Sequence, residues 1–550
     1  MADGDAKARH KQIVRCNGSH GPGTDSRIRA QGDGDLNTTR QESALAGLAW
    51  GVVGVLVAVK LALHFGVNLF GPYEFHRDEF LYMAMGRHLQ LWRMDFPPFI
   101  ALVSELTRGV FGDSLFAVRL FPALFSATLL VLAAVIAWEL GGGRFAQVFA
   151  ALCILANILF LRAGNLFQPV VFDQIWWTIA LLALVKLCKT NDPGWWLLFG
   201  IACGLGLLSK FSILIFGLAA LVGLVLSARR RELLTPWPWY AALLAFLIGS
   251  PSLVGQIQLG FPVLDQMGDL RSAQLARVTP LDFLVGQWDW GPQALIALAG
   301  LIALVAQRSL RRFRLVGWTC LAALVLLILL RGKSYYAGPV HPTLLAAGAV
   351  LIERFTVPRW STLLRWTAVM VVLGYSAVTL PIGLPILAPP TMVRYLDWLG
   401  SEDAVTTNVG NIERLPQDFA DMLGWEAQVD AVAQVFHGLD PAEQERVVLM
   451  GSNYGEAGAI DFYGPRRGLP GAIAYVGTYW YFGPGDKPGD VMISIGFSYD
   501  DMTDFFDTVA TAAHVMNHYA VAEQRDLFVY VCHGPRETLQ EVWPSLAGEQ

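Results

Sequence analysis

The sequence predicts a polytopic α-helical membrane protein with an α/β domain at its C-terminal end. Apolar residues make up 54% of the 550 residues and charged residues only 15%, a composition outside the usual range of soluble proteins. The apolar residues gather in runs of about 15 to 25, roughly the length that a helix needs to cross a bilayer. Beyond about residue 388 these runs give way to short apolar segments between helical patterns.

Charge is divided unevenly along the chain. Residues 390–550 contain 8 Lys or Arg against 24 Asp or Glu, a net charge of −16, whereas the rest of the chain carries +11. The basic residues are scattered over short loops, which argues against a nucleic-acid partner for either part. The six cysteines have no spacing typical of a disulfide framework or a zinc site.

Residues 1–43 are polar, and we expect a disordered cytoplasmic tail with no core for a cleavable signal. Residues 44–388 are expected to form the transmembrane domain, with a first span at about 44–65 and Lys60 snorkelling near its outer end. Ten more apolar runs bring the prediction to about eleven spans. They lie at about 115–138, 146–161, 169–187, 195–208, 211–227, 239–254, 293–306, 315–330, 337–352 and 364–387.

The distribution of Lys and Arg predicts the orientation. With the N-terminus in the cytoplasm, the loops rich in Arg and Lys all fall on the cytoplasmic side, as the positive-inside rule requires. The same alternation places residues 66–114, 255–291 and 389–550 outside. Residues Phe99, Leu102, Val103, Leu106 and Val110 recur at helical spacing, so we expect interfacial helices in loop 66–114.

Residues 389–550 are expected to form an extracytoplasmic α/β domain. Short apolar segments predict buried strands at about 446–450, 472–476, 491–495 and 527–531. Helical patterns cover about 425–436 and 501–513. The segment Asn453-Tyr454-Gly455-Glu456 follows a predicted strand, which favours a strand-to-helix turn with an acid in the first turn. A role in recognising a ligand over a neighbouring cavity is the alternative.

Charged residues in the outer loops are the candidate site residues, because charge at a membrane interface is costly unless it has a function. We expect them to converge at the outer face, although more than 250 positions separate the first from the last. Carboxylates beside cations would suit a reaction on an anionic lipid, in which a cation neutralises a departing phosphate and an Asp accepts a proton. The candidates are Asp78, Glu79, Asp95, Asp173, Lys210, Arg331, Lys333, Tyr336 and His341.

Several motifs in this order resemble glycosyltransferase family 39, the dolichyl-phosphate-mannose protein mannosyltransferase-like proteins, to which the lipid A aminoarabinose transferase is similar. The resemblance covers roughly residues 44–535. The motifs are the acidic pair Asp78-Glu79, Asp95-Phe96-Pro97-Pro98, Gly206-Leu207-Leu208-Ser209-Lys210, Gly332-Lys333-Ser334-Tyr335-Tyr336 with Pro339-Val340-His341-Pro342, and the segment 452–464.

The resemblance implies a GT-C fold and an inverting transfer of a hexose or pentose from a polyprenyl-phosphate carrier to an acceptor hydroxyl at the outer face of a bacterial inner membrane. It implies Asp78 as the base, Glu79 as its partner, and Asp95 and Asp173 as cavity acids that orient substrate or hold a divalent ion. Lys210, Arg331 and Lys333 would face the lipid phosphate, and Tyr336 and His341 would contribute to substrate binding. The acceptor is left open between protein, lipid and glycan.

The chain departs from the family pattern at Phe96, where related sequences often have His or Lys. A metal or phosphate contact from that position is therefore absent. The sequence leaves open whether a divalent ion is bound, and the candidate ligands are Asp78, Asp95 and His341.

Each candidate also has a structural interpretation. Asp78 and Glu79 could cap an interfacial helix, Asp95 could belong to a turn before Pro97, and Lys210 could snorkel. The competing function is a transporter or flippase of lipid-linked sugars, which would share an outer cavity. Transporters commonly show internal repeats, and none is seen in this sequence.

Overall fold

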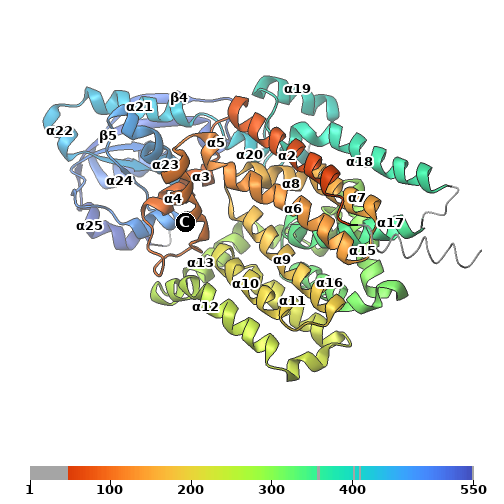
Figure 1. Ribbon diagram of the computed structural model, residues 1–550. Coiled ribbons are helices and arrows are strands. Elements are labelled where there is room, and N and C mark those ends of the chain that lie inside the picture. The colour runs from red at the N-terminus through yellow and green to blue at the C-terminus, as the bar shows by residue number, and fades with distance from the viewer. Residues whose placement is uncertain (1–46, 356–359, 401–402, 408–409, 548–550) are drawn as a thin grey trace, which may run out of the picture. The chain divides into compact units, whose positions relative to one another are not determined.

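The computed structural model describes residues 47–355, 360–400, 403–407 and 410–547. The predicted tail, residues 1–43, lies outside these ranges. Apolar helices dominate the chain up to residue 383, and a small sheet flanked by helices follows near the C-terminus (Figure 1). The chain is therefore a multi-pass membrane protein with a C-terminal α/β domain.

Six helical segments in the described ranges are long and apolar enough to cross a membrane. Two further pairs of helices form bent segments, which pass the same test only if each pair counts as one span. The six are α2 (Trp50–Phe70), α5 with α6 (Leu115–Val118 and Leu120–Glu139), α9 (Pro169–Thr190), α12 (Trp237–Gln258), η4 with α16 (Arg308–Phe313 and Arg314–Leu329) and α18 (Ser361–Gly383).

One bent pair consists of α7 (Arg144–Leu155) and α8 (Ile158–Asn165), which meet at 59°. The other joins the segment Pro280–Trp290, with α14 (Pro280–Val285) and η3 (Trp288–Trp290), to α15 (Pro292–Ala306) at 113°. Such a break places polar backbone groups inside the membrane domain, where other helices must cover them.

The predicted number of eleven spans is higher than the six to eight that the described residues provide. Three predicted spans form the helices α10 (Trp195–Ser209), α11 (Ile213–Leu226) and α17 (His341–Phe355), of 14 or 15 residues. A helix of that length rises only about 20 to 23 Å, less than the roughly 30 Å of a bilayer core. Apolar composition predicts that a segment lies in an apolar environment. It does not determine whether the helix is long enough to cross the membrane.

The prediction that Lys60 snorkels is wrong. It lies in the middle of α2, its side chain is fully buried, and its Nζ donates to the carbonyl oxygen of Phe160 at 3.1 Å. The first span extends to Phe70, so the prediction placed its outer end five residues too early.

Two short helices follow the first span, as predicted for loop 66–114. Helix α3 (Arg77–Arg87) begins with a capping box formed by His76 and Glu79, and α4 (Phe99–Phe111) follows the Pro97-Pro98 turn. One face of α4 packs inward, whereas Leu102, Leu106 and Val110 are exposed. Such an amphipathic helix is typical of a membrane interface. Residues 255–291 add α13 (Pro262–Ala273) and η2 (Leu275–Arg277).

The C-terminal sheet has five strands in the order β2-β1-β3-β5-β4. Strand β1 pairs in parallel with β2 and β3, while β3 and β4 both pair antiparallel with β5. The strands are β1 (Val448–Gly451), β2 (Ala472–Ile473), β3 (Val491–Ile495), β4 (Phe506–Met516) and β5 (Asp526–Pro535). The four predicted strands all correspond to strands of this sheet.

The predicted helix at 501–513 is wrong beyond residue 505. Helix α24 (Tyr499–Phe505) ends there, and β4 continues as an edge strand paired with β5. Thr508, Val509 and Thr511 are β-branched and pair with residues of β5, which stabilises the extended backbone. The other helices of this region are α19 (Pro389–Leu399), α20 (Gln417–Ala420), α21 (Trp425–Gly438), α22 (Pro441–Arg446), α23 (Tyr454–Tyr463) and α25 (Leu539–Val542).

The sheet domain packs on α3 through α23, and Figure 1 shows these two helices side by side. Phe80 of α3 contacts the rings of Trp425 and Phe462, with centroids 5.4 and 6.0 Å apart. The approach is close because Gly458 faces Phe80, where an added Cβ would lie 2.6 Å from the Cβ of Phe80. This shared core fixes the start of α3 against the start of α23.

Candidate functional site

A polar cavity of about 560 Å³ lies where α3, α8, α9 and the C-terminal domain meet. Three of the nine predicted site residues, Asp78, Lys210 and Lys333, line it. The structure therefore brings together a carboxylate and two cations that are far apart in the sequence. Its other polar lining residues are His76, Arg77, Tyr82, Arg162, Gln168, Gln274, Tyr335, Thr406, Thr407, Gln417, Asp418, Asp421 and Tyr454.

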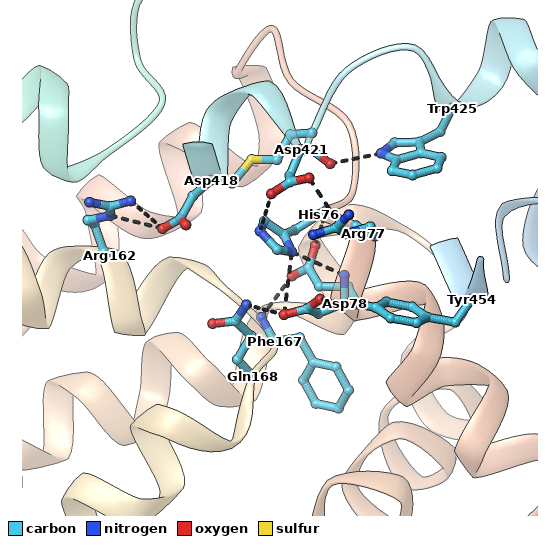
Figure 2. A network of polar contacts seen from close by, with 12 residues as sticks. His76, Arg77, Asp78, Arg162, Phe167, Gln168, Asp418, Asp421, Trp425 and Tyr454 are labelled. Carbon is cyan, nitrogen blue, oxygen red and sulfur yellow. Dashed lines mark hydrogen bonds and ion pairs between the residues drawn. The ribbon is translucent and has the colours of Figure 1, made fainter. Parts of the chain in front are cut away.

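Asp78 is held by one hydrogen bond to each carboxylate oxygen. The hydroxyl of Tyr454 donates to Oδ1 at 3.0 Å, and Nε2 of Gln168 donates to Oδ2 at 3.0 Å (Figure 2). The side chain keeps 27% of its surface exposed. A carboxylate oxygen has two lone pairs, so each oxygen retains capacity to accept a proton from a bound group.

His76 precedes Asp78 and caps α3. The backbone N–H of Asp78 donates to its Nδ1 at 3.1 Å, which leaves Nε2 as the nitrogen that faces Oδ2 of Asp421 at 3.8 Å. Nε of Arg77 lies 3.6 Å from Oδ1 of the same Asp421. Figure 2 shows Asp421 between these two side chains. Burial raises the pKa of Asp421, although the Arg77 guanidinium acts in the opposite direction.

Four cationic side chains, Arg77, Arg162, Lys210 and Lys333, line the cavity. Arg162 donates through its Nε to Oδ2 of Asp418 at 3.0 Å, and Lys333 donates to Oε1 of Gln274. Burial opposes the ionisation of Asp418, yet Arg162 and His76 together hold the pKa of Asp418 below its usual value. Burial lowers the pKa of Lys333 to about 8, and the nearby Lys210 ammonium adds to this effect. An anion in the cavity would relieve the repulsion between the two lysines.

Glu79 does not line the cavity. Its side chain is fully buried and accepts from Nε and Nη2 of Arg119 at 2.8 and 2.7 Å, and from the backbone N–H groups of Phe167 and His76 at 2.7 Å each. These four bonds use the whole carboxylate. Glu79 closes the capping box and anchors α3 to Arg119 and to the backbone at the α8–α9 connection. This matches the structural interpretation of Glu79 as a residue that caps the helix.

Asp173 and Asp95 also lie outside the cavity lining. Asp173 is buried in α9 and accepts from the hydroxyl of Ser212 at 2.8 Å. Asp95 is buried and accepts from the hydroxyl of Thr478 at 2.7 Å. Burial raises the pKa of Asp95 to about 6. Asp95 thereby links the turn before α4 to the C-terminal domain.

The remaining candidates, Arg331, Tyr336 and His341, do not line the cavity. Arg331 has a φ of 55° and donates to the carbonyl of Ala276 at 3.0 Å. The ring of Tyr336 packs under the Lys210 ammonium, with Nζ 4.9 Å from the ring centroid. His341 is buried, and its Nδ1 lies 2.9 Å from the carbonyl oxygen of Ala337. Tyr336 therefore acts on the site through Lys210, whereas His341 holds a turn.

The proposed metal ligands do not form a group. Asp95 and His341 are absent from the cavity that Asp78 lines. Within the described ranges, no three His, Cys, Asp or Glu side chains are arranged to hold a metal ion. In the cavity Arg162 forms an ion pair with Asp418, whereas the Asp78 carboxylate accepts hydrogen bonds from Tyr454 and Gln168.

Several lining residues have no signal in the sequence. Arg162 lies at the end of an apolar run, and Asp418 and Asp421 are two among many acids of the C-terminal segment. Tyr454 belongs to the segment 452–464, where the predicted turn is present: Asn453 caps α23 and Glu456 completes its capping box. The same turn projects Tyr454 toward Asp78, and Tyr454 lines the cavity. A role of this segment in recognising a ligand stays a prediction.

Comparison with known proteins agrees with this architecture. Residues 95–254 match the family described as dolichyl-phosphate-mannose-protein mannosyltransferase. The structure also resembles ArnT from Cupriavidus metallidurans, solved with bound undecaprenyl phosphate, with a TM-score of 0.55 and 17% identity over 88% of this chain and 98% of that one. The apo state of that protein gives a TM-score of 0.56. The chain has the GT-C fold.

The family match confirms the resemblance to glycosyltransferase family 39 over residues 95–254. Among curated relatives, undecaprenyl phosphate-alpha-4-amino-4-deoxy-L-arabinose arabinosyl transferase 1 of Sodalis glossinidius is 29% identical over 218 residues, 36% of this chain. The corresponding transferase of Yersinia pestis is 28% identical over 158 residues, 27% of this chain. These matches span 38% and 28% of the two relatives. The GT-C chain thus shares its fold over most of its length and its sequence over about a third.

Proposed function

We propose that this GT-C protein is a glycosyltransferase that moves a sugar from a polyprenyl-phosphate carrier to an acceptor hydroxyl, with inversion at the anomeric carbon. The observation behind the proposal is the cavity that Asp78 shares with Lys210, Lys333 and Arg162. This reaction needs a base and a cluster of cations in one cavity. The acceptor hydroxyl loses a proton to the base, and the sugar donor releases a phosphate whose negative charge the cations stabilise.

In this mechanism Asp78 accepts the proton of the acceptor hydroxyl while the hydroxyl oxygen forms a bond to the anomeric carbon of the donor sugar. The bond from that carbon to the phosphate oxygen breaks, and the polyprenyl phosphate departs with the electron pair. Lys210 and Lys333 stabilise the negative charge of this leaving group. Tyr454 and Gln168 hold the Asp78 carboxylate in a fixed orientation, which lowers the cost of reorganisation during the reaction.

The relatives suggest the donor. The curated relatives are named for a transfer from undecaprenyl phosphate-alpha-4-amino-4-deoxy-L-arabinose, so an undecaprenyl-phosphate-linked pentose is the first donor to test. We place the protein in a bacterial inner membrane with the cavity and the C-terminal domain on the outer side. The excess of basic residues in the loops at the opposite end of the helices supports this orientation.

The test compares Asp78→Asn with the wild type in purified form, using a labelled undecaprenyl-phosphate sugar and a cell-envelope acceptor extract. Asn is isosteric and can still accept from Tyr454, so the variant should fold. We expect product formation to fall by about 100-fold or more, the usual contribution of a general base. Glu105→Gln changes an exposed acid on α4 and serves as the control. Wild-type turnover by Asp78→Asn would refute the base.

Two further measurements distinguish a transferase from a transporter. A new glycosidic product, identified by mass spectrometry of envelope glycans from cells with and without the protein, requires an enzyme. Movement of labelled carrier across a vesicle membrane with no product would replace the proposal by transport.

A further inference from the structure

A second cavity, of about 920 Å³, lies at the far end of α9 from the candidate site. Helix α9 begins at Pro169, which lines the candidate site, and its penultimate residue, Lys189, lines the second cavity. A helix of 22 residues rises about 33 Å, the thickness of a bilayer core. The two cavities are therefore on opposite sides of the membrane domain.

The second cavity is strongly basic. Its lining includes Lys189, Arg229, Arg311, Arg312 and Arg314, and no Asp or Glu is among the described residues that line it. These cations come from three parts of the chain: the last turn of α9, Arg229 after α11, and η4 with the first residue of α16. Five positive charges from three separate parts of the chain thus line one cavity.

Only part of this charge is neutralised by the protein. Lys189 pairs with Glu139 at 2.8 Å, and Arg229 pairs with Glu232 at 2.5 Å. Within the part of the chain that the structure describes, Arg311, Arg312 and Arg314 form no ion pair with a carboxylate. Three adjacent guanidinium groups repel one another, and an anion bound among them would remove that cost.

Apart from Asn191 and Ser227, the rest of the lining is apolar or weakly polar. Leu226, Val305, Leu315 and Trp318 belong to it, and Leu221 and Val225 lie exposed on the same helix as Leu226. The cavity therefore joins a group of guanidinium donors to an apolar surface at the end of membrane helices. A free phosphate would use only the donors, whereas a phospholipid would use both parts.

The positive-inside rule explains why basic residues are on this side of the membrane, but it does not explain why they line one hollow. Arg230, Arg231 and Arg308 satisfy the rule equally well and do not line the cavity. We propose that this second cavity binds the phosphodiester headgroup of an anionic phospholipid, with Arg311, Arg312 and Arg314 as its main contacts. The bound lipid would tie the end of α9 to the two neighbouring loops.

The experiment uses the full chain, purified in detergent and exposed to phosphatidylglycerol or to zwitterionic phosphatidylcholine. Native mass spectrometry counts bound lipid, and thermal unfolding measures stabilisation. We expect retained phosphatidylglycerol and a raised unfolding temperature with phosphatidylglycerol only. The triple variant R311Q/R312Q/R314Q should bind it at least 10-fold more weakly. The triple variant R230Q/R231Q/R308Q removes the same charge outside the cavity and should bind like the wild type.

Two results would overturn the proposal. An equal loss in both triple variants would show general attraction to a basic surface. Equal stabilisation of the wild type by inorganic phosphate and by phosphatidylglycerol would show that the cavity takes a free anion. The comparison of headgroups on the wild type decides the matter even if a triple variant fails to fold, and no readout depends on transferase activity.

Discussion

The hydroxyl of Tyr454 lies 3.0 Å from Oδ1 of Asp78, although 376 positions separate the two residues. Tyr454 is at the start of α23 in the C-terminal domain, and Asp78 is in the first turn of α3. The C-terminal domain thus supplies one wall of the candidate site. Packing of Phe80 on Gly458 determines the distance between the two helix starts.

Replacing Tyr454 by Phe should lower kcat with little change in the donor KM, because the hydrogen bond orients the base and does not contact the donor in the proposed mechanism. A hydrogen bond to a charged group contributes about 1.5 to 3 kcal/mol, so we expect a loss of about 10- to 100-fold. Steady-state kinetics measures both constants. Tyr499→Phe changes an exposed tyrosine of the same domain and is the control. Unchanged kcat in Tyr454→Phe would contradict an orienting role.

Lys333 should give the reaction a pH dependence in the alkaline range. Burial lowers the pKa of Lys333 to about 8, so its positive charge is present below that pH and is lost as the pH rises through it. We expect kcat/KM for the donor to fall between pH 7 and 9. Lys333→Arg keeps its charge over this range and should flatten the profile, whereas Lys333→Gln should show low kcat/KM throughout. An Arg variant with the wild-type profile would assign the titration to another group.

The ion pair between Glu79 and Arg119 should matter for folding. Removing one partner of a buried pair costs about 3 to 5 kcal/mol because the other charge stays buried alone. Glu79→Gln should therefore lower the unfolding temperature and the yield of folded protein. Asp490→Asn removes a partner from a more exposed pair with Arg446, where about 0 to 1 kcal/mol is expected. A stable Glu79→Gln protein without turnover would restore the catalytic role implied by the family resemblance.

Asp95 should make the protein less stable as the pH rises. Burial raises the pKa of Asp95 to about 6 in the folded state, whereas about 3.9 is usual in an unfolded chain. The folded protein then binds the proton more tightly, so the free energy of unfolding falls from about pH 4 to pH 6 and is level above. Asp95→Asn should remove this contribution while keeping an acceptor for Thr478. Thermal unfolding at pH 4 to 7 measures the difference, with the exposed Asp486→Asn as control. Equal slopes in all three proteins would contradict it.

Local patterns predicted those parts of the fold that depend on neighbours in the chain. The turn at Asn453, the helix at 425–436 and the strand at 491–495 appear where composition and spacing predict them. The prediction fails where tertiary contacts decide. A helical pattern was predicted at 501–513, but residues 506–513 belong to β4, because β5 offers a partner for their backbone.

The candidate site shows the same division. Sidedness in the sequence selected Asp78, Lys210 and Lys333, which share one cavity. The same criterion selected Glu79 and Asp173. The sequence cannot distinguish a charged residue near a span end that binds substrate from one that pairs with another side chain. Only the tertiary structure distinguishes Asp78, whose carboxylate is partly exposed, from Glu79, whose oxygens accept from Arg119 and backbone groups.

The sequence by itself determined that this chain crosses a membrane many times, that a mixed α/β domain follows, and which types of residue could serve a reaction on an anionic lipid. These properties depend on composition and on periodicity over neighbouring residues. The tertiary structure alone decided which carboxylate remains open and that Arg162, Asp418 and Tyr454 join it. Those outcomes depend on contacts between segments up to several hundred residues apart, and hydrophobic patterns specify that such segments are buried without specifying which of them meet.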